Sequence, residues 1–112
     1  MQAIDKAKLC IKIIGERKAI DQVIFVVSKL VSITDYFLIA SGSSSRQVQA
    51  IASHLQRRMR DQGIRPDGIE GEQEGHWVLM DYGDVVIHLF YQPIREFYDL
   101  EGLWIDAPRM DL

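Results

Sequence analysis

Apolar residues recur at helical spacing near the start of the chain. Ile4, Ala7, Ile11 and Ile14 follow one another at steps of three or four residues. This spacing places them on one face of a helix, because about 3.6 residues make one turn. Gly15 is a typical residue for the end of such a helix.

A second apolar stripe predicts a longer helix in the middle of the chain. Ser43–Ser45 offer hydroxyl groups that can cap its N-terminus, and Gly63 suits its C-terminal end. Most arginines of this stretch fall outside the stripe, as expected for the solvent-facing side of an amphipathic helix. The stripe consists of Val48, Ile51, Ala52, Leu55 and Met59.

Four segments have the pattern of β-strands. Gln22–Val27 is a short segment rich in β-branched residues, and Tyr36–Ala40 is a second short segment, of apolar residues. His76–Tyr82 and Asp84–Phe90 flank Gly83, which indicates a tight or a bulged hairpin. The last of these strands is apolar at nearly every position, so we expect it at the centre of a sheet.

Proline and glycine residues in the rest of the sequence complete the predicted order of elements. A turn at Pro66–Gly68 leaves room for one short strand before the hairpin, and Pro93 is expected to begin a final helix, Ile94 to about Leu100. Residues 103–112 are expected to form an irregular tail. We therefore predict a single α/β (α+β) domain over residues 1–112, with a mixed sheet of about five strands flanked by helices.

The composition agrees with one soluble domain. The 112 residues are 47% apolar and 26% charged, and 13 basic against 16 acidic residues give a net charge of −3. A net acidic chain is a poor candidate for nucleic-acid binding through counterion release, so an RNA partner would need a local basic patch or a protein intermediary. We expect no sequence-specific binding of nucleic acid.

Targeting and redox signals point to the cytoplasm. No apolar run approaches the roughly 18–20 residues of a membrane span, and Met1–Lys8 has neither a secretory core nor the composition of a transit peptide. Cys10 is the single cysteine, which excludes an intramolecular disulfide and a Cys-based metal site. We expect it to be a lone buried or half-buried thiol.

One segment has the composition of an anion site. Gly42 and Ser43–Ser45 stand at a strand-to-helix junction, where free backbone N–H groups can bind a phosphate. The same residues serve equally well as a strand end and an N-cap. Neither a P-loop lysine nor a GxGxxG pattern accompanies them, so the capping role is favoured.

Carboxylates near the hairpin are the next candidates. Asp81 and Asp84 flank its turn, and Glu70 and Glu72 precede it. Two carboxylates near a Gly-Ser loop would suit a metal-dependent nucleotidyl transfer, because carboxylates hold the Mg²⁺ ions that bind a triphosphate. Such pairs usually stand two residues apart on one strand, whereas a turn separates these two. Formation of the turn itself is the alternative role.

The histidines do not suggest a metal centre. His54, His76 and His88 lie on three predicted elements, without the spacing of zinc ligands. We therefore expect neither a metal nor another cofactor. His88 interrupts an apolar strand, so it is either buried with a hydrogen-bond partner or exposed on a functional face of the sheet.

The predicted hairpin has one aliphatic face and one mixed face. Strand alternation puts Val85, Ile87 and Leu89 on the face expected to contact helices, and Val86, His88 and Phe90 on the other. In the preceding strand, Trp77, Leu79 and Asp81 share one face, and the other carries Val78, Met80 and Tyr82. Aromatic and Met side chains on a sheet are typical interface anchors, although they can equally cap the core under a helix. The aromatic segment Phe97–Trp104 is likewise either a cover for the sheet edge or a docking strip.

Several strings resemble one family over nearly the whole chain, from about Ala3 to Trp104. They are Ser32–Phe37 (SITDYF), Ile39–Arg46 (IASGSSSR), Glu70–Glu72 (EGE), Trp77–His88 (WVLMDYGDVVIH) and Arg95–Trp104 (REFYDLEGLW). This pattern is similar to that of the ribosomal silencing factor (RsfS, or Iojap) family. Family members often carry an Asp near the end of the first strand, where this chain has Val26 and Val27.

The resemblance implies a fold related to nucleotidyltransferases, without transferase activity. It also implies a translational repressor that binds the large ribosomal subunit through a protein of its intersubunit face. Such binding would block joining of the small subunit when nutrients are limited. The alternatives are a nucleotidyltransferase-like enzyme with a nucleotide–Mg²⁺ site at the Gly-Ser loop and a homodimer formed through an apolar face of the sheet.

We predict that the hairpin and Arg95–Tyr98 form the docking surface for the ribosomal protein. Aromatic anchors would supply most of the affinity. The predicted partner-binding residues are Trp77, Met80, Asp81, Tyr82, His88, Phe90, Arg95 and Tyr98.

Overall fold

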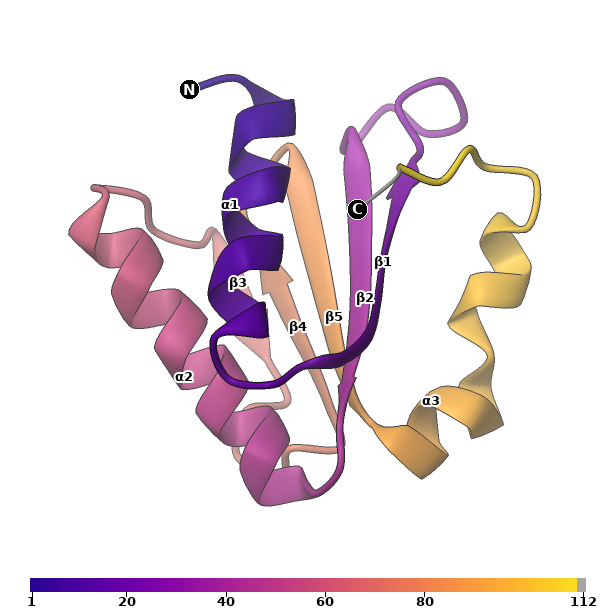
Figure 1. The fold of residues 1–112 in the computed structure, drawn as a ribbon. Helices are drawn as coiled ribbons and strands as arrows, with labels where there is room; N and C mark the ends of the chain where they lie inside the picture. Colours follow the sequence, from indigo (N-terminus) through magenta and orange to yellow (C-terminus); the bar gives the residue numbers. More distant parts are fainter. Residues whose placement is uncertain (111–112) are drawn as a thin grey trace.

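A five-stranded mixed sheet lies between two layers of helix in the computed structural model, which describes residues 1–110 (Figure 1). The strand order is β1-β2-β5-β4-β3. The strands are β1 (Ile20–Val26), β2 (Tyr36–Gly42), β3 (Gly68–Glu70), β4 (Trp77–Asp81) and β5 (Val85–Tyr91). The helices are α1 (Ala3–Gly15), α2 (Ser45–Asp61), α3 (Gln92–Tyr98) and the short 3₁₀ helix η1 (Leu100–Trp104). The predicted fold class is confirmed.

The centre of the sheet is the parallel pair β2 and β5. Tyr36 pairs with Val85 at one end of the register and Gly42 with Tyr91 at the other, while all other strand pairs are antiparallel. Both strands are covered on both faces, which explains why β5 is apolar at nearly every position. The predicted central position of this strand is confirmed.

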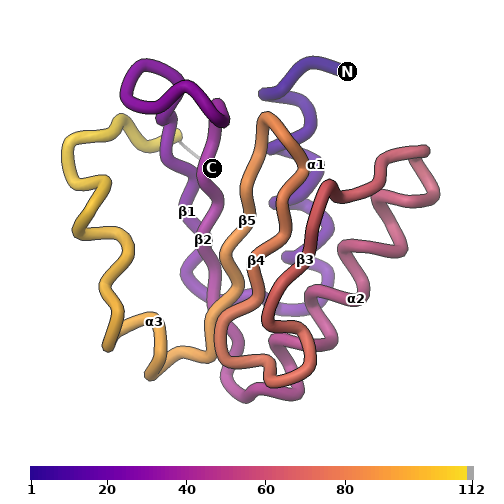
Figure 2. Tube along the Cα trace, turned by 180° about the vertical axis from the view of Figure 1, so that it is seen from behind, coloured from indigo at the N-terminus to yellow at the C-terminus, as the bar shows by residue number. Residues whose placement is uncertain are grey.

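Two cores lie on opposite faces of the sheet. On one face, Ile14 of α1 and Leu55 of α2 pack with Leu38, Ile87 and Leu89 in one buried cluster. The other face is covered by α3, η1 and the segment after it, as seen from behind in Figure 2. Its buried cluster is richer in aromatic residues and contains Phe25, Phe37, Ile39 and Phe90. The aliphatic face of β5 thus contacts α1 and α2, as predicted.

The chain after η1 returns to the sheet. The N–H group of Val26 donates to the carbonyl of Pro108 at 2.7 Å, and that of Met110 donates to the carbonyl of Ile24 at 2.9 Å. Arg109 also forms an isolated bridge with Phe25. Within the predicted irregular tail, residues 103–104 belong to η1, whereas residues 105–110 have only turns and the isolated bridge; residues 111–112 lie outside the described part.

None of the helices within residues 1–110 has the length and apolar character that a membrane crossing requires.

Two glycines with positive φ differ in their surroundings and test one constraint of the fold. Gly71 has a φ of 82°, and a Cβ there would lie 2.1 Å from the carbonyl oxygen of Trp77. Gly63 has a φ of 77°, and a Cβ there would have no neighbour within 4 Å. Gly63→Ala should cost about 1 kcal/mol of unfolding free energy from backbone strain alone. Gly71→Ala should cost at least about 2 kcal/mol more, because the backbone must also move.

Urea unfolding of the two variants measures this difference. Equal losses of stability would show that the close approach of Gly71 to β4 does not constrain the fold.

Candidate partner-binding site

A cluster of aromatic rings covers the face of the sheet that packs against α3. Trp77 of β4 and His88 and Phe90 of β5 point to this face, and Tyr98 joins them from α3. The ring centroid of Trp77 lies 4.9 Å from that of Phe90, 5.2 Å from that of Tyr98 and 5.9 Å from that of His88. Aromatic contacts at these separations are stabilising, so the cluster stabilises the packing of α3 against the β4–β5 hairpin.

A partly buried hydrogen bond joins two members of this cluster. The indole Nε1–H of Trp77 donates to Nδ1 of His88 at 3.0 Å. An indole N–H can only donate, so Nδ1 must be an unprotonated acceptor. His88 is 6% exposed, and burial lowers its pKa to about 4. The imidazole is therefore neutral at physiological pH and has its hydrogen-bond partner inside the protein.

The cluster reaches the surface along one border. Tyr98 is 55% exposed and Phe97 is 78% exposed, whereas Trp77 and Leu79 are half-buried. Trp77 and Leu79 also line a shallow cavity of about 350 Å³ with Glu70 and Gly71. We refer to the aromatic residues Trp77, Phe97 and Tyr98, together with the neighbouring aliphatic Leu79, as the aromatic rim.

Arg95 connects α3 to neighbouring elements through hydrogen bonds. Its guanidinium group donates to both carboxylate oxygens of Glu101, at 2.8 and 3.2 Å, and to the hydroxyl of Ser41 at 2.8 Å. The hydrogen bonds from Arg95 hold the pKa of Glu101 below its usual value. Arg95 is only 7% exposed, so it links α3, η1 and the end of β2 internally.

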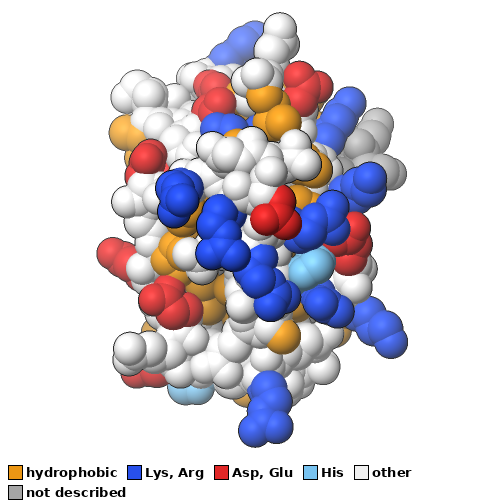
Figure 3. Space-filling view, turned by 90° about the vertical axis from the view of Figure 1, so that its left-hand side faces the viewer, with side chains coloured by type: hydrophobic (Ala, Val, Ile, Leu, Met, Phe, Trp, Pro, Cys, Tyr) orange, Lys and Arg blue, Asp and Glu red, His pale blue; other side chains and the backbone are white. Residues whose placement is uncertain are grey.

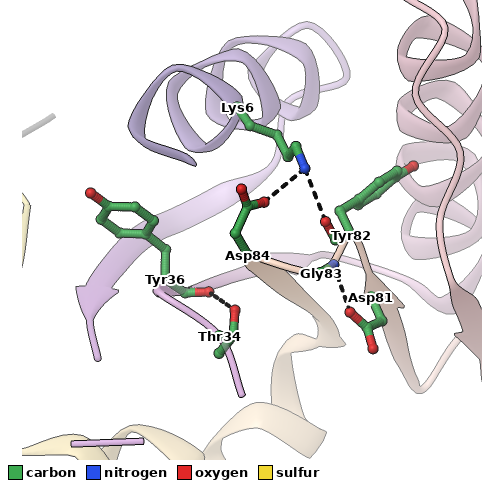
Figure 4. Close-up of polar contacts among 7 residues, drawn as sticks. All are labelled: Lys6, Thr34, Tyr36, Asp81, Tyr82, Gly83 and Asp84. Carbon is green, nitrogen blue, oxygen red and sulfur yellow. Dashed lines mark hydrogen bonds and ion pairs between the residues drawn. The ribbon is translucent and has the colours of Figure 1, made fainter. Parts of the chain in front are cut away.

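The two aspartates of the hairpin also serve the fold (Figure 4). Lys6 of α1 reaches Asp84 with an ion pair of 2.7 Å and donates to the carbonyl of Tyr82 at 3.1 Å. Asp81 accepts a hydrogen bond of 2.8 Å from the backbone N–H of Gly83. The turn-forming role predicted as the alternative to metal binding is confirmed for Asp81, whereas the side chain of Asp84 pairs with Lys6 instead.

The Gly-Ser loop has the geometry of an N-cap. The hydroxyl of Ser44 accepts from the N–H of Gln47 at 3.1 Å, and the side chain of Gln47 accepts from the N–H and the hydroxyl of Ser43. A Cβ on Gly42 would lie 2.9 Å from Cγ2 of Val48, so this glycine allows close helix packing. Over residues 1–110, no group of three or more His, Cys, Asp or Glu side chains is arranged to hold a metal ion.

Comparison with known proteins identifies the family. Residues 1–112 match the family described as ribosomal silencing factor during starvation. The chain belongs to the ribosomal silencing factor family. A ribosomal silencing factor from Halalkalibacterium halodurans is 43% identical over 106 residues, which cover 94% of this chain and 90% of that protein. A crystal structure of a protein from Chromobacterium violaceum has a TM-score of 0.90 at 38% identity, over 93% of this chain and 87% of that one.

A more distant relative has an organellar name. The mouse protein named mitochondrial assembly of ribosomal large subunit protein 1 is 33% identical over 99 residues, which cover 86% of this chain and 43% of that protein. The names of these relatives describe silencing and assembly proteins rather than enzymes. The resemblance inferred from the sequence motifs is confirmed.

The eight predicted partner-binding residues of this chain do not share one surface. Met80 and Tyr82 point to the opposite face of the sheet and pack against α1 and α2, where they are 0% and 4% exposed. The structure therefore does not bring them together with Trp77, because strand alternation turns them to the other face of the sheet. In the same core lies Cys10, the predicted buried thiol, whose pKa is raised to about 12 by burial.

Three more of the eight lie on the same side of the sheet as Trp77 but beneath its surface. His88, Phe90 and Arg95 support the aromatic rim from below and are at most 7% exposed. Trp77, Asp81 and Tyr98 remain accessible, but Asp81 lies at the hairpin turn, at the other end of β4 from Trp77.

Two members of the aromatic rim, Leu79 and Phe97, lie within the predicted hairpin and the predicted segment Arg95–Tyr98 but were not among the eight residues. Leu79 could have been found because alternation places it on the same face as Trp77. Phe97 belongs to the aromatic segment Phe97–Trp104, whose two possible roles the sequence could not distinguish.

The buried imidazole makes stability depend on pH in a defined window. The unfolded chain protonates His88 below about pH 6.5, whereas the folded chain protonates it only below about pH 4. Falling pH across this window therefore favours the unfolded state, by roughly 3 kcal/mol in total. His88→Gln removes this titration and keeps an acceptor for the indole of Trp77, so the variant should lose less stability on acidification than the parent.

Urea unfolding at about pH 7 and about pH 4.5 measures both losses. Because the other titratable groups are common to both proteins, the difference between the losses isolates His88. Equal losses would mean that burial does not lower the pKa of His88 in the folded protein.

Proposed function

We propose that this chain binds the large ribosomal subunit through a protein of its intersubunit face, with the aromatic rim as the docking surface. A body of 12.9 kDa held there would occupy space that the small subunit needs. The chain would thus repress translation under nutrient limitation, acting in the cytoplasm without catalysis. Membership of the ribosomal silencing factor family supports the ribosomal target.

The observation that supports this surface is the exposure of aromatic side chains above a rigid base. Interface anchors are typically large aromatic residues that lie in fixed positions before the partner arrives. Trp77 is fixed by its hydrogen bond to His88 and by its contact with Phe90. Tyr98 is fixed by its contact with Trp77 and by the Arg95 network under α3.

Truncation of an anchor tests the surface. Trp77→Ala and Tyr98→Ala should each weaken binding to isolated large subunits by about 30-fold, since loss of an anchor costs about 2 kcal/mol. Tyr98 is the cleaner position, because its side chain is 55% exposed and its removal leaves the core intact. Sedimentation with separated large and small subunits at physiological salt measures the binding and the yield of joined ribosomes.

Two control variants separate docking from folding. Tyr82→Phe removes a buried hydroxyl on the opposite face, and Ile33→Ala truncates an apolar side chain that is 80% exposed between β1 and β2. Both should sediment with large subunits as the parent does. If folded Tyr98→Ala and Trp77→Ala also bind like the parent, the aromatic rim is not the docking surface. If the parent itself stays at the top of the gradient, the ribosomal target is wrong for this chain.

A further inference from the structure

The basic residues of this chain are concentrated in the two helices on one side of its sheet. The residues of α1, α2 and the turns that follow them (1–18 and 43–65) include ten basic and three acidic residues, a net charge of +7. The rest of the sequence has three basic and thirteen acidic residues, a net charge of −10. Figure 3 shows the consequence, with Lys and Arg side chains gathered over the surface formed by α1 and α2.

Eight side chains make up this surface, which we call the basic face. All eight are exposed, and over residues 1–110 none of them forms an ion pair. Arg58 is excluded, because Glu16 already binds it. The basic face consists of Lys8, Lys12, Arg17, Lys18, Arg46, Arg57, Arg60 and Arg65.

The stability of the helices does not explain these charges. Basic residues near the end of α2 complement the helix dipole, which accounts for Arg60. Arg46, however, lies in the first turn of α2, where a cation meets the positive end of the dipole. Lys8 and Lys12 are four residues apart on α1, and like charges at this spacing repel.

The arrangement along α2 is that of a linear track. With about 100° of rotation per residue, Arg46, Arg57 and Arg60 fall within a stripe about 60° wide, and at 1.5 Å per residue they span about 21 Å. Near the end of this stripe, Arg60 and Arg65 line one small cavity of about 220 Å³ together with Gln56. A guanidinium group can bind a phosphate with two parallel hydrogen bonds. Arg57 and Arg60, about 4.5 Å apart along the axis, suit neighbouring phosphates, and Arg46, about 16 Å from Arg57, suits a more distant one.

We propose that the basic face binds the phosphate backbone of RNA, independently of base sequence. This second contact goes beyond the proposed protein docking through the aromatic rim, which lies across the sheet from it. A membrane surface is disfavoured because α2 has no large apolar side chain exposed beside its arginines for insertion between lipids. An acidic protein is disfavoured because eight dispersed charges without an apolar anchor suit a uniformly charged polymer better than a protein interface.

Fluorescence anisotropy with a labelled RNA duplex of arbitrary sequence, about 20 base pairs long, tests this proposal without ribosomes. The full-length parent should bind with an affinity that falls steeply between about 50 and about 200 mM salt. Arg57→Gln/Arg60→Gln should reduce the slope of log K against log salt by about two and weaken binding by about 25-fold at physiological salt. Glutamine keeps the helix propensity of arginine, and thermal unfolding verifies the fold.

Matched single substitutions show whether position or net charge matters. Arg60→Gln and Lys29→Gln each remove one exposed positive charge, but Lys29 lies between β1 and β2, outside the basic face. The first should weaken binding by about fivefold and the second should leave it unchanged. Asp61→Asn, at the end of α2, should strengthen it.

Three results would overturn the proposal. They are absence of duplex binding at about 50 mM salt, equal weakening by Arg60→Gln and Lys29→Gln, and tighter binding to phosphatidylserine vesicles or to polyglutamate than to RNA. The proposed function has a separate readout, because Tyr98→Ala should lose large subunits while it binds the duplex like the parent. Loss of large subunits by Tyr98→Ala with no duplex binding by the parent would leave the protein docking intact and refute only the RNA contact.

Discussion

The parallel pairing of β2 with β5 is the constraint on which the rest of the structure depends. Because the two strands run in the same direction and in register, their carboxyl ends lie side by side, with Gly42 beside Tyr91. Each is followed almost at once by a helix, and the two helices cover opposite faces. This topology separates α2 with its arginines from α3 with its aromatic residues. Two chemically different surfaces thus result from one strand pairing.

Much of this fold could be predicted from the sequence, because periodicity is a local property. The apolar stripes of α1 and α2, the hairpin at Gly83 and the central position of β5 each follow from a few neighbouring residues. The same alternation already divided Trp77 and Leu79 from Met80 and Tyr82, yet the predicted docking surface combined residues of both faces. Only the placement of helices on the sheet shows that Met80 and Tyr82 lie in the aliphatic core.

Arg95 shows what local pattern could not provide. A charged residue in an exposed segment is normally expected in solvent, and nothing near it in sequence indicates burial. Its burial depends on Ser41 from β2 and on Glu101, which is turned towards it after Asp99 adopts a left-handed conformation with a φ of 44°. Net charge was similarly misleading, because a sum of −3 does not reveal that ten of the thirteen basic residues belong to α1, α2 and the turns beside them, on one side of the sheet.

The pairing of the segment around Arg109 with β1 has a consequence for self-association. Exposed strand edges are templates on which further chains can add, and this sheet has two of them. At β3 the edge is only three residues long. β1 is a seven-residue strand, and backbone groups on its outer side form hydrogen bonds with the backbone of Pro108 and Met110. The backbone after η1 therefore occupies the edge of β1 on which another chain could otherwise pair. Preparations in which this segment is clipped or displaced by a fusion would present an open β1 to neighbouring molecules and would be prone to stacking into aggregates.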